Sequence, residues 1–286
     1  MLFEDFQLRT VDTGEVKIRL RHGGEGPPLL LLHGHPQTHM MWHHIAPQLA
    51  RKFTVVMPDL RGYGDSSKPQ TTDDHFPYSK RAMARDQIAV MKELGFKQFS
   101  VVGHDRGGRC AYRLALDFPE AITKLAVLDI IPTGEAFRRA NKEFALGFWH
   151  WFFLAQPFDL PERLIGRNPD DFYFRGDRSL FHPEALDDYL RCIHQPGTIH
   201  AMCEDYRAGA SIDCQLDEAD LGIHKIGCPV LALWSEQGEL PKWYDVLSVW
   251  RDWAEEVEGR GINCGHYLAE EAPEETYEEL HNFLIK

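Results

Sequence analysis

The chain has 286 residues, of which 43% are hydrophobic and 26% charged, so it is long enough for one large, well-buried domain with an insertion. Its formal net charge of −13, with no basic stripe, argues against a nucleic-acid partner. The six cysteines lack metal-ligand or redox spacing, no signal-peptide pattern opens the sequence, and the apolar runs are only strand-length. We therefore expect a cytoplasmic protein with free thiols and no membrane span.

Strand and helix patterns alternate along most of the chain. A hairpin is expected from residues 3–10 and 15–22, around a turn at 12–14. Apolar runs typical of strands buried on both faces occur at 28–33, 53–59, 99–103, 125–130 and 229–234. Helical patterns occur at 42–51, 79–94, 106–118, 245–254 and 273–284. The alternation predicts an α/β fold whose central sheet is mostly parallel and flanked by helices.

The alternation stops between residues 133 and 215. This region is rich in aromatic and polar residues, and its periodicity is helical. We interpret it as a helical cap inserted into a core formed by residues 1–132 and 216–286. Sites in open α/β sheets lie beyond the carboxyl ends of the strands. A cap inserted there would cover the site and exclude water from it.

A candidate nucleophile, Asp105, follows the apolar run at 99–103. It stands at the centre of a glycine-x-nucleophile-x-glycine frame, between Gly103 and Gly107, and a helical pattern follows. This frame marks a sharp, strained strand-to-helix turn that needs small residues around it. Serine is the usual central residue, so the carboxylate excludes a serine-type esterase. A carboxylate nucleophile instead displaces a leaving group at carbon and forms an alkyl ester.

A base and an acid complete the expected machinery. His266 follows a strand-like stretch and precedes the terminal helical pattern, which fits the chain order nucleophile, acid, histidine. The acid has two candidate positions. One is Asp129, at the end of the run at 125–130, and the other holds Glu236 and Glu239, after the run at 229–234. We prefer Asp129, because an aspartate that ends a buried apolar strand is costly unless it is paired.

Groups that bind anions surround the predicted nucleophile. The backbone amides of His35, after the run at 28–33, and of Arg106 are expected to form an oxyanion hole. Arg106 and Arg109 lie three residues apart and share a helix face, and guanidinium groups bind carboxylates through two parallel hydrogen bonds. We therefore expect both arginines to hold the carboxylate of an anionic substrate. No acidic or thiolate ligands accompany the histidines, so a metal site is disfavoured; the histidines concerned are 33, 35, 39, 43 and 44.

Four motifs, taken together, resemble the fluoroacetate (haloacetate) dehalogenases of the α/β-hydrolase superfamily over nearly the whole chain. They are His33-Gly34-x-Pro36-Gln37-Thr38, Asp59-Leu60-Arg61-Gly62-Tyr63-Gly64-Asp65-Ser66, Asp105-Arg106-Gly107-Gly108-Arg109 and Cys203-Glu204-Asp205-Tyr206-Arg207-Ala208-Gly209. The resemblance implies an α/β-hydrolase fold with an inserted cap, Asp105 as nucleophile, His266 as base and Asp129 as its partner. One departure is His35, where family members often carry an aromatic or other apolar residue.

The resemblance also implies a halide pocket in the cap, formed by His150, Trp151 and Tyr206. Departing fluoride is small and strongly hydrated, so it needs donors that replace water, and imidazole, indole and phenol groups supply them. The implied reaction converts a haloacetate to glycolate and halide through an aspartyl ester, with a small haloacid as substrate and no metal or organic cofactor. The family further suggests a homodimer.

Two other functional hypotheses remain open. An epoxide hydrolase shares the aspartate, histidine and acid but protonates the epoxide oxygen with cap tyrosines, for which Tyr173, Tyr189 and Tyr206 are available. The arginine pair disfavours it. An inactive hydrolase-fold binding protein would typically have lost the base or the acid. The sequence leaves open whether fluoride or chloride is preferred.

Overall fold

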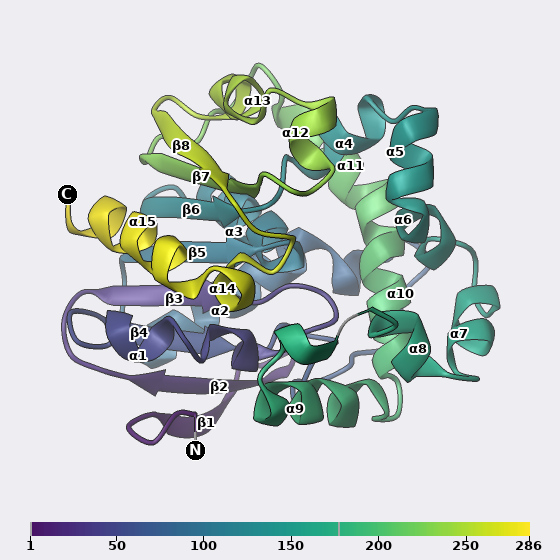
Figure 1. The fold of residues 1–286 in the computed structure, drawn as a ribbon, viewed down its shortest axis with the longest axis horizontal. Helices are drawn as coiled ribbons and strands as arrows, with labels where there is room; N and C mark the ends of the chain where they lie inside the picture. The colour runs from purple at the N-terminus through teal and green to yellow at the C-terminus, as the bar shows by residue number, and fades with distance from the viewer. Residues whose placement is uncertain (1, 177) are drawn as a thin grey trace.

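The computed structural model describes residues 2–176 and 178–286 and is built around one eight-stranded sheet (Figure 1). The strand order is β1-β2-β4-β3-β5-β6-β7-β8. The β1–β2 and β2–β4 pairs are antiparallel, and every pair from β4 to β8 is parallel. The strands are β1 (Gln7–Asp12), β2 (Lys17–Gly23), β3 (Pro28–Leu32), β4 (Thr54–Pro58), β5 (Phe99–His104), β6 (Ile122–Leu128), β7 (Val230–Ser235) and β8 (Val257–Ile262). The predicted mostly parallel sheet is confirmed.

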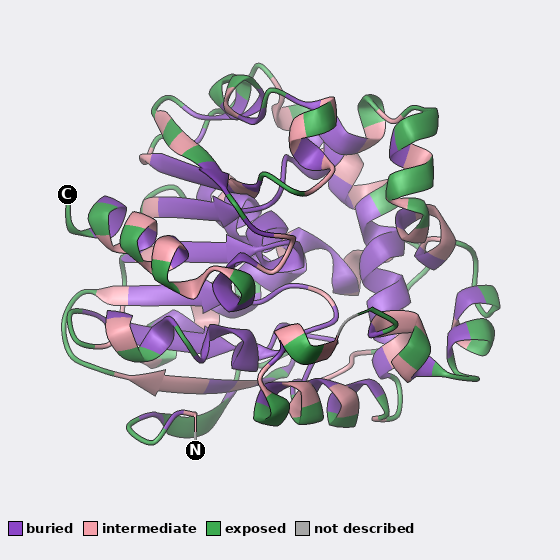
Figure 2. Cartoon of the chain, viewed as in Figure 1, coloured by how far each residue is buried: buried purple, intermediate pink, exposed green. Residues whose placement is uncertain are grey.

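The central strands form the core because both of their faces are covered. Leu29 to Leu32 in β3 and Leu125 to Leu128 in β6 are fully buried, as continuous apolar runs predict for parallel strands (Figure 2). The edge hairpin differs, since β1 is exposed at all but one position. It begins later than expected, at Gln7 rather than residue 3, and its turn is closed by hydrogen bonds between Thr13 and Val16.

Helices cover both faces of the sheet (Figure 1). On one side α1 packs against α15, and on the other α2 packs against α3. The core helices are α1 (Ala46–Leu49), α2 (Lys80–Glu93), α3 (Arg106–Asp117), α12 (Leu240–Trp243), α13 (Val246–Trp253), α14 (Leu268–Glu271) and α15 (Pro273–Ile285), with short helices η1 (His39–Trp42) and η2 (Phe76–Tyr78). The helix expected at 42–51 is divided into η1 and α1. Pro47 has no N–H to donate, so it is accommodated only in the first turn of a new helix.

The chain between β6 and β7 is helical, and its helices lie beyond the carboxyl ends of the parallel strands (Figure 1). They are α4 (Thr133–Arg138), α5 (Lys142–Gly147), α6 (Trp149–Leu154), α7 (Leu160–Ile165), α8 (Pro169–Tyr173), η3 (Arg178–Leu180), α9 (Pro183–Ile193), α10 (Thr198–Ala208), η4 (Gly209–Asp213) and α11 (Cys214–Asp220). α10 is central to this cap, since it contacts α6, α7 and α9. α11 continues past residue 215, where we expected the cap to end. Among the described residues, no helix combines the length and hydrophobicity needed to cross a membrane.

Candidate active site

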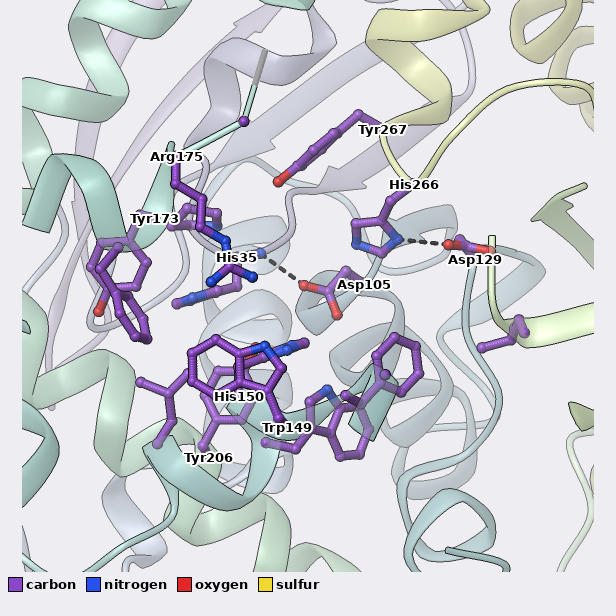
Figure 3. Close-up of a pocket in the computed structure, with 18 of the residues that line it drawn as sticks. His35, Asp105, Asp129, Trp149, His150, Tyr173, Arg175, Tyr206, His266 and Tyr267 are labelled. Atoms are coloured by element: carbon purple, nitrogen blue, oxygen red, sulfur yellow. Dashed lines mark hydrogen bonds and ion pairs between the residues drawn. The ribbon is translucent and has the colours of Figure 1, made fainter. Parts of the chain in front are cut away.

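Asp105 occupies a strained turn between β5 and α3. Its backbone is left-handed, with φ 45° and ψ −116°. The turn is also tightly packed, because a Cβ on Gly107 would lie 2.4 Å from the carbonyl oxygens of Leu32 and His33. Only glycine allows that approach, as expected for a turn that raises a nucleophile above the sheet. The Asp105 side chain faces a cavity of about 430 Å³ between the sheet and the cap (Figure 3).

His266 and Asp129 meet beside this cavity (Figure 3). His266 Nδ1 lies 2.6 Å from Asp129 Oδ2, and the Ser235 backbone N–H donates to Asp129 Oδ1 at 2.9 Å. Asp129 is therefore fixed from two sides. Of the alternative acids, Glu239 pairs with Lys242 at 2.8 Å, and the described contacts of Glu236 do not include His266. The structure thus brings His266 together with Asp129, the acid preferred from the sequence.

The charges in the site shift the pKa values of Asp105 and His266 in opposite directions. Burial opposes ionisation of Asp105, but His266, His104 and the two arginines hold the pKa of its carboxyl well below the usual range. Burial likewise opposes protonation of His266. The hydrogen bond and charge of Asp129, aided by Asp105, outweigh it and raise the pKa of His266. Asp105 is thus an anion at any ordinary pH, while His266 titrates above its usual range.

The predicted oxyanion hole is partly occupied by the Asp105 carboxylate. The His35 backbone N–H donates to Asp105 Oδ2 at 3.0 Å (Figure 3). The Arg106 amide follows directly, at the first position of α3. One oxygen of Asp105 is therefore held by backbone, which leaves its second oxygen for chemistry in the cavity. An ester formed through the second oxygen would leave the held oxygen as its carbonyl oxygen, beside a donor that stabilises negative charge.

The two arginines expected to act together have different surroundings. Arg106 is 1% exposed, and it donates to Asp205 from Nε at 2.9 Å and from Nη2 at 2.6 Å. Its guanidinium also lies 4.3 Å from the centre of the Tyr206 ring. Arg109 lines the cavity, donates only to the neutral oxygens of Ile131 and Thr133, and leaves its buried Nε unpartnered. Of the two arginines on α3, Arg109 is therefore the one without a carboxylate partner, and it is available to an anionic ligand.

The three residues expected to bind halide line one wall of the cavity. The rings of His150 and Trp151 lie 6.1 and 6.3 Å from that of Tyr206. Burial lowers the pKa of His150 to about 4, so the imidazole is neutral, with one N–H to donate. Burial also raises the pKa of Tyr206 far above its usual value, so the phenol keeps its proton. The wall therefore offers neutral donors to a departing anion.

The tyrosines considered for epoxide opening are not equivalent. Tyr173 and Tyr206 line the cavity, whereas Tyr189 donates its hydroxyl to Glu270 at 3.0 Å. The Tyr173 hydroxyl is itself buried and has no hydrogen-bond partner.

The N-terminal histidines have separate partners, since His33 Nε2 accepts from the Leu60 N–H and His39 pairs with Asp59.

The sequence analysis assigned no role to two side chains that line the cavity. The ring of His35, noted above for its amide and as a departure from the family pattern, points into the cavity and lies 5.2 Å from the rings of Tyr173 and Tyr206. Arg175 extends into the same space from the loop after α8 (Figure 3). Arg175 belongs to none of the four motifs, and His35 occupies the variable position of the first. Asp205 was visible inside a motif, but its pairing with Arg106 spans 99 positions and could not be read from spacing.

Comparison with known proteins agrees with this geometry. The family model described as the alpha/beta hydrolase fold matches residues 27–273. A fluoroacetate dehalogenase from Burkholderia sp. is 44% identical, covering 99% of this chain and 95% of the relative. A soluble epoxide hydrolase from Corynebacterium sp. (strain C12) is 34% identical, covering 88% and 87%. A candidate α/β hydrolase from Nostoc sp. PCC 7120 is 56% identical, with a TM-score of 0.97 and 99% of each chain covered.

These relatives span nearly the full length of the chain, so the likeness includes the cap as well as the sheet. The resemblance predicted from four sequence motifs is confirmed. The chain belongs to the α/β-hydrolase family, among the relatives of fluoroacetate dehalogenase.

Proposed function

We propose that the protein hydrolyses the carbon–halogen bond of haloacetates and releases glycolate and halide. One observation carries the proposal: an ionised Asp105 and the unpaired cation of Arg109 line a single cavity. A substrate carboxylate on Arg109 would direct the halogen-bearing carbon toward Asp105. The fluoroacetate dehalogenase from Burkholderia sp. supports the same reaction class.

In the first step, the free oxygen of Asp105 attacks the α-carbon. A carbon–oxygen bond forms as the carbon–halogen bond breaks, and the halide leaves with the bonding electron pair. Because attack is in line, the halide departs on the side away from Asp105, where donors from His150, Trp151 and Tyr206 would receive it. The product of this step is a carboxymethyl ester on Asp105.

In the second step, His266 removes a proton from water, and the oxygen adds to the carboxyl carbon of the Asp105 ester. The resulting oxyanion is stabilised by the His35 and Arg106 amides. Collapse breaks the ester bond, and protonated His266 returns its proton to the leaving alkoxide of glycolate. Asp129 keeps the imidazole oriented and stabilises its protonated form.

Electrostatics favour an anionic substrate despite the anionic nucleophile. Arg106 is already compensated by Asp205, whereas the hydrogen bonds of Arg109 to described residues go to neutral oxygens. A carboxylate that binds beside Arg109 gains a charge-assisted pair in a buried setting, which offsets its repulsion from Asp105. The expected consequence is that Arg109→Gln raises KM for haloacetates more than it lowers kcat.

Ion-selective measurement of fluoride and chloride tests the proposal, with fluoroacetate and chloroacetate as substrates. The wild-type protein should release halide, and Asp105→Asn should release none above background. An uncharged epoxide is included because the Corynebacterium relative is a soluble epoxide hydrolase. Diol formation without halide from any haloacid would refute dehalogenation in favour of epoxide opening. Turnover of neither class would refute both enzyme assignments.

A further inference from the structure

Arg175 is a cation with no anionic partner in the same cavity. It lies in the loop after α8, is exposed, and enters the space from the side of Asp105 opposite to His266 (Figure 3). No hydrogen bond or ion pair joins it to the described residues, and its guanidinium carbon lies 5.2 Å from the centre of the Trp149 ring. A long side chain directed into a cavity without a carboxylate partner is available to bind a ligand.

The cavity therefore has a cation at each end. Arg109 is 3% exposed and stacks at 4.4 Å on Trp151, which is also 3% exposed. Arg175 stacks on Trp149, which is 36% exposed. Arg109 thus marks the buried end and Arg175 the open end. The two guanidiniums come from separate elements, α3 in the core and the loop after α8 in the cap.

The cavity has more positive charge and more volume than a haloacetate needs. One carboxylate compensates Arg109 and leaves Arg175 unmatched. Burial lowers the pKa of His35 to about 3 and that of His150 to about 4, so neither ring adds a positive charge to the cavity. A cavity of about 430 Å³ is within the size range of pockets that hold drug-sized ligands, far larger than a two-carbon acid.

We propose that Arg175 is a specificity-determining residue that binds the second carboxylate of a 2-halo dicarboxylic acid. The inference rests on the proposed dehalogenase function. The carboxylate next to the halogen-bearing carbon occupies Arg109, the carbon faces Asp105, and the remote carboxylate reaches Arg175. Removal of a charge-assisted hydrogen bond of this kind is expected to weaken binding by about tenfold or more.

Chloride release tests the inference with three substrates: chloroacetate, 2-chlorobutanoate and 2-chlorosuccinate. The 2-chlorobutanoate has the same carbon count as 2-chlorosuccinate but lacks its second charge, so it separates size from charge. The variants are Arg175→Gln and, as a matched control, Arg167→Gln, which removes an exposed cap arginine outside the cavity. We expect Arg175→Gln to raise KM for 2-chlorosuccinate about tenfold and to change the other two less than twofold. Arg167→Gln should leave KM for all three substrates unchanged.

Two outcomes would overturn the inference while leaving the proposed function intact. One is an equal loss on all three substrates, which would mean that Arg175 acts on the shared carboxylate. The other is wild-type turnover of chloroacetate without turnover of 2-chlorosuccinate. If the wild-type protein releases chloride from none of the three, the proposed function itself fails, and the inference fails with it.

Discussion

Asp205 joins the cap to the core through buried charges, and its removal should destabilise the protein. It lies on α10 of the cap, whereas its two cationic partners, Arg106 and Lys80, belong to core helices α3 and α2. The Arg106 Nη2 to Asp205 Oδ1 distance is 2.6 Å, and none of the three side chains is more than 1% exposed. Tyr63 adds a hydrogen bond to the same carboxylate at 2.7 Å.

Asp205→Asn keeps the shape of the side chain but leaves two buried cations without their anion. Loss of one partner of a buried ion pair costs about 3–5 kcal/mol in free energy of unfolding. For a chain of 286 residues the same change lowers Tm by roughly 5–8 °C. Thermal and urea unfolding would measure the loss of stability, which should appear in both Tm and the free energy of unfolding.

The matched control is Glu239→Gln, which also removes one carboxylate from an ion pair. Its side chain is 41% exposed and that of its partner Lys242 is 57% exposed, so the expected cost is at most about 1 kcal/mol. If Asp205→Asn unfolds within about 1 kcal/mol of the wild type, as the control should, the reasoning that this cluster fastens the cap is refuted.

Three further predictions concern the reaction and the turn that carries the nucleophile. Burial lowers the pKa of His266, but Asp129 and Asp105 outweigh burial and raise it. Acidification below that pKa should therefore halt ester hydrolysis, while Asp105, whose pKa is low, still forms the ester. A single burst of halide per site at acid pH would show this, and steady release would contradict it. Asp129→Asn should lower kcat on the order of 10⁴-fold, whereas Glu239→Gln should keep most of it, and the reverse ranking in a halide assay would reassign the acid. Gly107→Ala should abolish stable folding in thermal melts because its Cβ meets backbone at 2.4 Å, whereas Gly227→Ala, with no atom within 4 Å, should melt like the wild type.

The sheet was predictable because burial on both faces leaves a local signature. Continuous apolar runs such as Leu29 to Leu32 are required wherever helices cover both sides of a strand, and each such run became a strand. Short or interrupted helices were less predictable. Residues 42–51 have helical composition, but Pro47 and the contacts of the preceding turn divide them into two elements.

The turn that holds Asp105, the predicted nucleophile, could be predicted because it imposes a local glycine pattern. A Cβ on Gly103 would meet the backbone of Gly107 and Gly108 in the same turn, and one on Gly107 would meet the end of β3, so both positions need glycine and the pattern marks Asp105. Asp129 was a weaker inference, drawn from the cost of a carboxylate at a buried strand end, and the contact with His266 agrees with it.

Arg106 and Arg109 show what residue spacing alone cannot predict. Their shared helix face was correctly inferred, yet Arg106 is compensated by a cap carboxylate and Arg109 is not. That difference depends on Asp205, which folding brings from another element. The same holds for Arg175 and the His35 ring, which reach the cavity only because loops from cap and core converge there.

The central claim is that Asp105 becomes covalently bonded to the substrate, and a single turnover in heavy-oxygen water tests it most directly. With the protein in excess over chloroacetate, the first turnover should place the heavy oxygen in the Asp105 carboxylate, because water attacks the ester at that carbon. The first glycolate released should carry the original Asp105 oxygen in its hydroxyl group. Mass spectrometry of the Asp105 peptide and of the product would report both. Heavy oxygen in the first glycolate, with an unlabelled Asp105, would contradict the account.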